Sequence, residues 1–111
     1  MEITVKNLQD YLFHHYGSRA TEQGMFMKLV EEMGEVAEIL NKRAGRKASA
    51  EDDLQQELAA ELADVIHYTV AIAAINGIDL TGTILAKDKT ASVKYHHDMN
   101  LETFLGNLGG L

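Results

Sequence analysis

Two short stretches of this chain repeat one pattern: Glu32-Met33-Gly34-Glu35-Val36 and Glu61-Leu62-Ala63-Asp64-Val65. In each stretch two acids stand three residues apart, with apolar or small residues around them. Acids three apart on a helix lie on one face. Two such pairs facing each other across a helix interface would gather four carboxylates, and like charges so close disfavour joint ionisation. Because a divalent cation removes that penalty, the repeat predicts a metal site in a helical bundle.

The composition of the chain agrees with an all-α protein. Its 111 residues suit one domain with one core, so a single domain is expected over residues 1–111. There is no proline, and there is no cysteine to form disulfides or thiolate metal sites. The net charge of −7 argues against a nucleic-acid partner. No signal peptide is recognised and the longest apolar run, over 65–75, is too short for a bilayer, so we expect a cytoplasmic protein without a membrane partner.

Hydrophobic periodicity predicts four helices, over about 5–15, 21–42, 50–75 and 79–95. Thr4 and Ser49 are the expected caps of the first and third helices. The polar segment 43–53 is predicted to be an exposed loop. Asn100 is expected to cap a short terminal turn through Leu105, and the tail over 106–111 to be loosely ordered.

The helical phase of the acids is the main argument for the site. At about 100° per residue, both acid pairs fall on the flank of an apolar stripe, with apolar residues above and below them. One such pair is usually an ordinary boundary feature, but two at the same phase favour a site, because buried carboxylates need partners. The inward residues predicted for the first three helices are Val5, Leu8, Tyr11, Leu12 and Tyr16; Leu29, Val30, Met33, Val36, Ala37 and Leu40; and Leu58, Leu62, Val65, Ile66, Thr69 and Ala73.

The segments Glu31-Glu32-Met33-Gly34-Glu35 and Glu61-Leu62-Ala63-Asp64 resemble the MazG-like nucleotide pyrophosphohydrolases of the all-α NTP pyrophosphatase group. The family pattern is Glu-x-x-Glu, a gap, and Glu-x-x-Asp, and the resemblance covers residues 29–95. It implies a four-helix, MazG-type bundle completed by dimerisation. It implies hydrolysis of an NTP or dNTP to the monophosphate and pyrophosphate, with nucleotide-pool house-cleaning as one use. It also implies Mg²⁺, with Mn²⁺ as a substitute, held by Glu32, Glu35, Glu61 and Asp64.

The expected chemistry is in-line attack of a metal-activated water on the α-phosphorus. Glu31 and Glu35 are the catalytic candidates, because a spare carboxylate can orient or deprotonate that water. Lys28, Lys87 and Lys94 are candidate substrate contacts. On the fourth helix, many relatives carry Lys, Asn and Arg-Tyr where this chain has Lys87, Thr90 and Lys94-Tyr95.

The third helix and its histidine bear on the assembly of the chain and on an alternative metal site. The third helix is apolar almost all round over 59–75, which predicts a homodimer, or a homotetramer, with that helix near the interface. Asp64 and His67 have the spacing of di-iron carboxylate bundles, but such sites need a second acid-x-x-His, which this chain lacks. A non-catalytic helical module that binds a partner or a nucleotide is the other alternative, and the four intact acids favour the enzyme.

Overall fold

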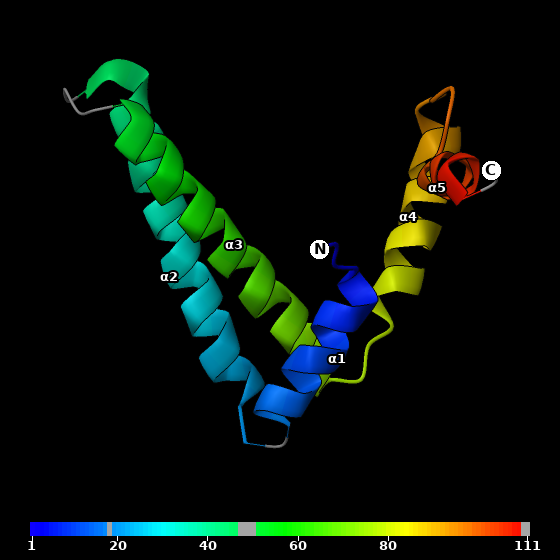
Figure 1. Cartoon of the computed structure of the whole chain (residues 1–111), viewed down its shortest axis with the longest axis horizontal. Coiled ribbons are helices and arrows are strands. Elements are labelled where there is room, and N and C mark those ends of the chain that lie inside the picture. Colours follow the sequence, from blue (N-terminus) through cyan, green and yellow to red (C-terminus); the bar gives the residue numbers. More distant parts are fainter. Residues whose placement is uncertain (18, 47–50, 110–111) are drawn as a thin grey trace. The chain divides into compact units, whose positions relative to one another are not determined.

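The computed structural model describes residues 1–17, 19–46 and 51–109, and for 46, 51 and 52 it describes the backbone alone. The five α-helices are α1 (Val5–Tyr16), α2 (Glu22–Asn41), α3 (Glu51–Ile75), α4 (Leu80–Lys94) and α5 (Leu101–Gly109), and η1 (Lys42–Arg46) follows α2 as a short π-helical segment (Figure 1). Those described residues contain no strand, so the predicted all-α class is confirmed. The chain divides into two compact units, Met1–Ile78 and Asp79–Leu111.

The first unit is an α2–α3 hairpin with α1 packed on α3 (Figure 1). Thr4 caps α1 as predicted: its hydroxyl accepts from the Asn7 amide at 3.0 Å, and the Asn7 side chain accepts from the Thr4 amide at 2.8 Å. The chain leaves α1 at Gly17, which adopts φ +52° and donates its N–H to the Phe13 carbonyl at 2.7 Å. Glycine suits this position because a side chain disfavours positive φ. The turn leads directly into α2, so α1 stays beside the hairpin.

One acid of each pair, Glu32 on α2 and Glu61 on α3, lies within the seam between the two helices and not on its flank. Where α2 and α3 face each other, the buried and half-buried residues recur at spacings of three and four, the pattern of a coiled-coil seam. They are Met25, Leu29, Glu32, Val36 and Ile39 on α2, and Leu54, Leu58, Glu61, Val65, Tyr68 and Ile72 on α3. The seam therefore contains one acid from each pair.

This seam corrects the predicted inward stripes. Leu29, Val36, Leu58 and Val65 do face inward, but their apolar neighbours lie outside the seam. Five residues predicted to be core are between 45% and 55% exposed in this chain: Val30, Met33, Leu40, Leu62 and Ile66. Ala37 and Thr69 are exposed as well. The cause is that α2 carries large apolar residues both along the seam and along the predicted stripe, so the helical period fits either face.

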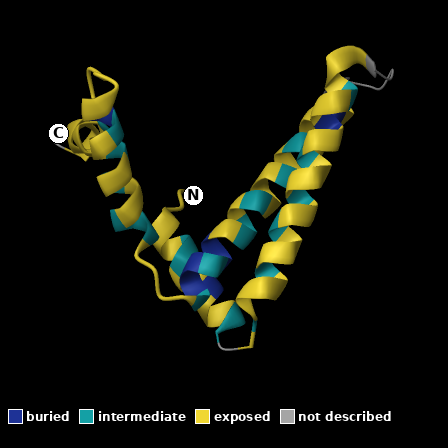
Figure 2. Cartoon of the chain, turned by 180° about the vertical axis from the view of Figure 1, so that it is seen from behind, coloured by how far each residue is buried: buried dark blue, intermediate teal, exposed yellow. Residues whose placement is uncertain are grey.

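The best-packed part of the first unit lies where α1 meets the C-terminal half of α3 (Figure 2). Leu12 is completely buried there, next to a run of small buried residues on α3: Val70, Ala71, Ala73 and Ala74. Small residues let two helices approach closely, which explains why α1 crosses at this point. Two residues predicted to face inward from α1 do not, because Val5 and Tyr11 are exposed.

The second unit pairs α4 with α5. Asp79 caps α4 by accepting from the Gly82 amide at 3.1 Å, and Asn100 caps α5 as predicted, accepting from the Thr103 amide at 2.8 Å. Asp88 of α4 accepts from the Leu101 amide at 2.6 Å and joins the two helices. Helix α5 continues to Gly109, beyond the predicted end at Leu105. That the whole chain forms one domain stays a prediction.

The region between α2 and α3 is more helical than predicted. The expected loop over 43–53 overlaps η1 and the start of α3, whereas the expected cap Ser49 lies outside the described residues. Because α3 begins early, Asp53–Ile75 is long and apolar enough to span a bilayer by length and composition, unlike the shorter run considered from the sequence. Core helices of soluble proteins pass the same test, so the absence of a membrane partner stays a prediction.

Candidate metal centre

The hairpin brings the two acid pairs together at the middle of its seam. Carboxylate oxygens of Glu32, Glu61 and Asp64 all lie within 4.8 Å of one another. Glu35 lies one turn beyond Glu32, and its carboxylate is one of the neighbours that raise the pKa of Glu61. Three of the four predicted ligands thus form one group and the fourth adjoins it, as expected from acids three apart on facing helices.

Without a cation, it is energetically unfavourable for all the carboxylates of this group to be ionised together. Hydrogen bonding of its side chain to Glu32 and to Glu35, followed by burial and the charges of both neighbours, raises the pKa of Glu61 from 4.5 to about 8. One oxygen each of Glu32 and Glu61, the Oε2 atoms, is shielded from solvent and has no hydrogen-bond partner. Shielded carboxylate oxygens without donors are costly, and a hard divalent cation is the ligand that would satisfy them.

Two further candidate residues, Lys28 and Glu31, lie on the exposed surface of α2 outside the carboxylate group. Lys28 and Glu31 form an ion pair at 3.5 Å, and both side chains are more than half exposed. The ion pair lies one turn from Glu35 on α2, so Glu31 belongs to the outer edge of the acidic region. Of the two catalytic candidates, Glu35 is the one whose carboxylate contributes to the raised pKa of Glu61, and Glu31 is not.

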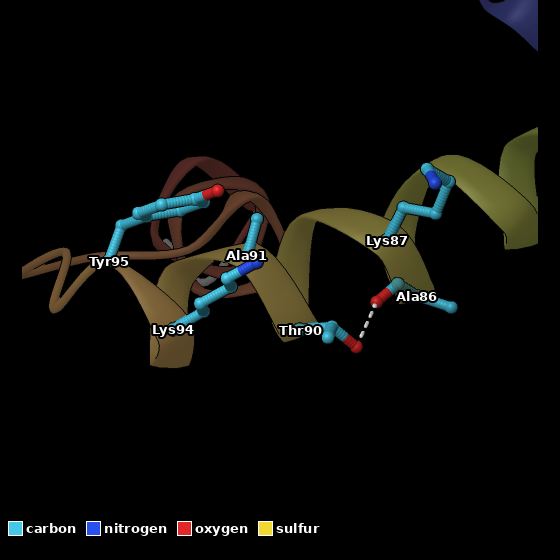
Figure 3. Close-up of a pocket in the computed structure, with 6 residues that line it drawn as sticks. All are labelled: Ala86, Lys87, Thr90, Ala91, Lys94 and Tyr95. Atoms are coloured by element: carbon cyan, nitrogen blue, oxygen red, sulfur yellow. Dashed lines mark hydrogen bonds between the residues drawn. The ribbon is translucent and has the colours of Figure 1, made fainter.

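Lys87 and Lys94 lie in the second unit, on one face of α4. With Thr90 and Tyr95 they line a surface hollow of about 400 Å³ (Figure 3). Thr90 donates its hydroxyl to the Ala86 carbonyl at 3.2 Å, and the Lys94 ammonium lies 5.3 Å from the centre of the Tyr95 ring. The hollow is basic and open, which suits a phosphate contact, and the participation of these lysines in the site stays a prediction.

His67 has a role that the sequence did not indicate. Its Nε2 lies 2.6 Å from the hydroxyl of Tyr16, which ties α1 to α3 one turn beyond Asp64. Among the described residues, the group that could hold a metal ion consists of three carboxylates and contains no histidine. No periodicity in the sequence reveals a partner 51 positions away along the chain.

Comparison with known proteins identifies the family. Residues 20–96 match the MazG nucleotide pyrophosphohydrolase domain. The chain belongs to this family. It is similar to the crystal structure of iMazG from Vibrio DAT 722, with 31% sequence identity and a TM-score of 0.64 over 84% of this chain and 98% of that chain. No match is found among curated proteins.

Membership of the MazG family confirms the predicted fold and enzyme class. The matched domain takes in α2, α3 and α4, and therefore both acid pairs. Helices α1 and α5 lie outside it, although α1 supplies the Tyr16 contact with His67. For this MazG domain the acidic group in the α2–α3 seam is the candidate metal centre.

Proposed function

We propose that this protein is a Mg²⁺-dependent pyrophosphohydrolase that cleaves a nucleoside or deoxynucleoside triphosphate to the monophosphate and pyrophosphate. The observation that carries the proposal is the group of Glu32, Glu61 and Asp64, whose ligand oxygens lie within 4.8 Å of one another. Two shielded oxygens in that group accept no hydrogen bond. All the atoms that could coordinate a metal ion there are carboxylate oxygens. Both features fit Mg²⁺, which prefers oxygen ligands and shares its coordination with substrate phosphates.

Glu32, Glu35, Glu61 and Asp64 would hold the ion, with Mn²⁺ able to replace Mg²⁺. When bound, the ion neutralises the triphosphate and lowers the pKa of a coordinated water. We assign Glu35 as the group that accepts the proton of the attacking water, because it adjoins the cluster through Glu61. Glu31 is the outer candidate for the same task.

The substrate phosphates need cations from the protein as well. Lys28 is the candidate in the first unit, since its ammonium lies 3.5 Å from Glu31, at the edge of the acidic region. Lys87 and Lys94 are the candidates in the second unit, where they share one face of α4. Lysine suits this task because its flexible stem brings a compact positive charge to a phosphate oxygen. Nucleic acid is not an expected partner, because the chain is acidic overall.

We further propose a homodimer, with a homotetramer as the larger alternative. Val30, Met33 and Leu40 each directly follow a seam residue of α2, and Leu62 and Ile66 do so on α3. On two antiparallel helices, equal offsets from the seam fall on the same side of the pair. These half-exposed residues therefore form one apolar surface, and burial of the exposed half of each would contribute about 1 kcal/mol. A second copy of the chain, docked through the same surface, would cover it.

The test is pyrophosphate release from a panel of NTPs and dNTPs with Mg²⁺, for the native chain and for Glu61→Gln and Asp64→Asn. We expect the native chain to release pyrophosphate. In both variants the rate of release should fall by more than the roughly 10–100-fold that is lost when a residue that only supports a metal ligand is replaced. Glu38→Gln is the matched control, because Glu38 is an exposed acid on α2 that lies 3.7 Å from Lys42. Metal binding without release from any nucleotide would favour the non-catalytic module instead.

A further inference from the structure

A second hollow lies in the first unit, where α1 turns into α2. It has a volume of about 430 Å³ and is lined by His15, Tyr16, Arg19, Ala20 and Met25. Two rings, one guanidinium and two apolar side chains surround the same space. Flat rings with an apolar floor suit an aromatic ligand, whereas a guanidinium supplies only hydrogen-bond donors. We propose that the base of the substrate nucleotide occupies this hollow, an inference that rests on the proposed function.

The hollow is held in shape before any ligand binds. The Tyr16 hydroxyl lies 2.6 Å from Nε2 of His67, which fixes the ring of Tyr16 against α3. The ring of His15 meets that of Tyr16 edge to face, with centroids 4.8 Å apart. Arg19 donates from Nη2 to the His15 carbonyl at 3.1 Å, which leaves its other N–H groups free for a ligand. A preformed aromatic site loses less entropy on binding than a mobile one.

The hollow and the carboxylates open on the same flank of the hairpin. Asp64, His67 and Ala71 are three and four residues apart, so they share one face of α3. His67 hydrogen-bonds to Tyr16 of α1, and Ala71 is completely buried at the contact with α1. The face of α3 that carries Asp64 is thus the face that α1 covers one turn further along. A ligand can reach from the carboxylates to the hollow without crossing the seam.

The separation of the two places matches the length of a nucleotide. Met25 lines the hollow, and Glu32 belongs to the carboxylate group seven residues later on the same line of α2. At a rise of 1.5 Å per residue, the two lie about 10 Å apart along the helix. That distance is comparable to the separation of the α-phosphate and the base across the sugar. A nucleotide with its α-phosphate at the carboxylates therefore places its base at Tyr16 and Arg19.

The donors of Arg19 favour bases with two adjacent acceptors. Guanine offers O6 and N7, and cytosine offers O2 and N3, whereas the matching edge of adenine combines an acceptor with a donor. An arginine cannot accept a hydrogen bond, so it leaves the adenine donor unpaired. The expected consequence is a preference for guanine and cytosine nucleotides over adenine nucleotides.

The variant Arg19→Gln tests this preference through the ratio of kcat/KM for dGTP and dATP. Glutamine pairs with the mixed edge of adenine, so the ratio should fall about tenfold, the effect of one well-formed base contact. Arg43→Gln is the matched control, since Arg43 is an exposed arginine in η1, after the C-terminal end of α2, and the ratio of this variant should equal that of the native chain. An unchanged ratio in Arg19→Gln would overturn the base site.

Binding of the product dGMP tests the base site separately from the proposed function, because binding of a monophosphate requires no cleavage. Calorimetry should show that dGMP binds at least about tenfold more weakly to Tyr16→Leu than to the native chain, the effect of removing one stacking partner. Tyr16→Phe keeps the ring but loses the hydroxyl that contacts His67, so it should bind dGMP more weakly than the native chain and more tightly than Tyr16→Leu. Equal binding by all three would contradict the base site even if triphosphates are cleaved. Ring-dependent binding without cleavage of any triphosphate would uphold the base site and remove the proposed function.

Discussion

Protonation of Glu61 gives the sharpest quantitative prediction about the metal centre. Its neighbours Glu32 and Glu35 raise the pKa of Glu61 to about 8, so at pH 6 to 7 the free protein holds nearly one extra proton. A ligand carboxyl must be deprotonated to bind a cation. Binding of Mg²⁺ should therefore release about one proton per site at pH 6 to 7, about half a proton at pH 8, and almost none above pH 9.

The assay is titration calorimetry with Mg²⁺ in buffers of different ionisation enthalpy, which reports the number of protons released. The logarithm of the metal affinity should rise with pH at a slope of about one below pH 8 and level off above it. Glu61→Gln should release no such proton and bind Mg²⁺ weakly, whereas Glu38→Gln should match the native chain. Proton release near zero at pH 7 in the native chain would refute the electrostatic account of the seam.

The same pKa fixes how the stability of the metal-free protein depends on pH. A carboxyl whose pKa is higher in the folded state than in the unfolded state favours folding while it is protonated in the folded chain. That contribution is complete below about pH 4.5 and is lost as the pH rises through 8. Without metal, the melting temperature should therefore fall between pH 5 and pH 8.5. Saturating Mg²⁺ should raise the melting temperature most at the upper end of that range, where protons no longer compete.

Three further predictions test the packing. Leu12→Ala should lower the free energy of unfolding by about 2–5 kcal/mol in urea titrations, because Leu12 is completely buried between α1 and α3; a change near zero would contradict that contact. Ile66→Asp should halve the mass in light scattering if Ile66 lies in the dimer interface, and a native mass would argue against this interface. Gly34→Ala should stabilise the chain by up to about 1 kcal/mol, because an added Cβ would meet no atom within 4 Å; destabilisation would mean that a second copy occupies this space.

The sequence predicted that the acids of α2 and α3 lie close together, because the signal for this is local. Residues three apart share a helix face whatever the tertiary structure, so Glu32 and Glu61 could be matched before their helices were placed. The sequence did not determine which side of each helix faces the other. Val30 and Met33 carry the helical period as strongly as Met25 and Leu29 do. Both sides are apolar, and periodicity alone cannot distinguish a contact within the chain from one with a second copy.

Features that depend on contacts between distant residues could not be predicted. The hydrogen bond between Tyr16 and His67 joins two helices, and neither residue belongs to a sequence motif that would predict the other as its partner. The extent of α5 was underestimated because Gly106 and Gly109 were interpreted as a loose tail. The apolar residues Phe104 and Leu108 recur one turn apart and favour a helix over that span, although glycine weakens it.

The central claim is that this MazG domain directs water to the α-phosphorus of a nucleoside triphosphate. Turnover of a cleaved triphosphate in ¹⁸O-labelled water, followed by mass spectrometry of the products, tests it most directly. Four carboxylates without a strong nucleophile favour direct attack by water, so the label should be found in the monophosphate, and Glu61→Gln should abolish it. Label found only in pyrophosphate, or release of orthophosphate, would contradict the account.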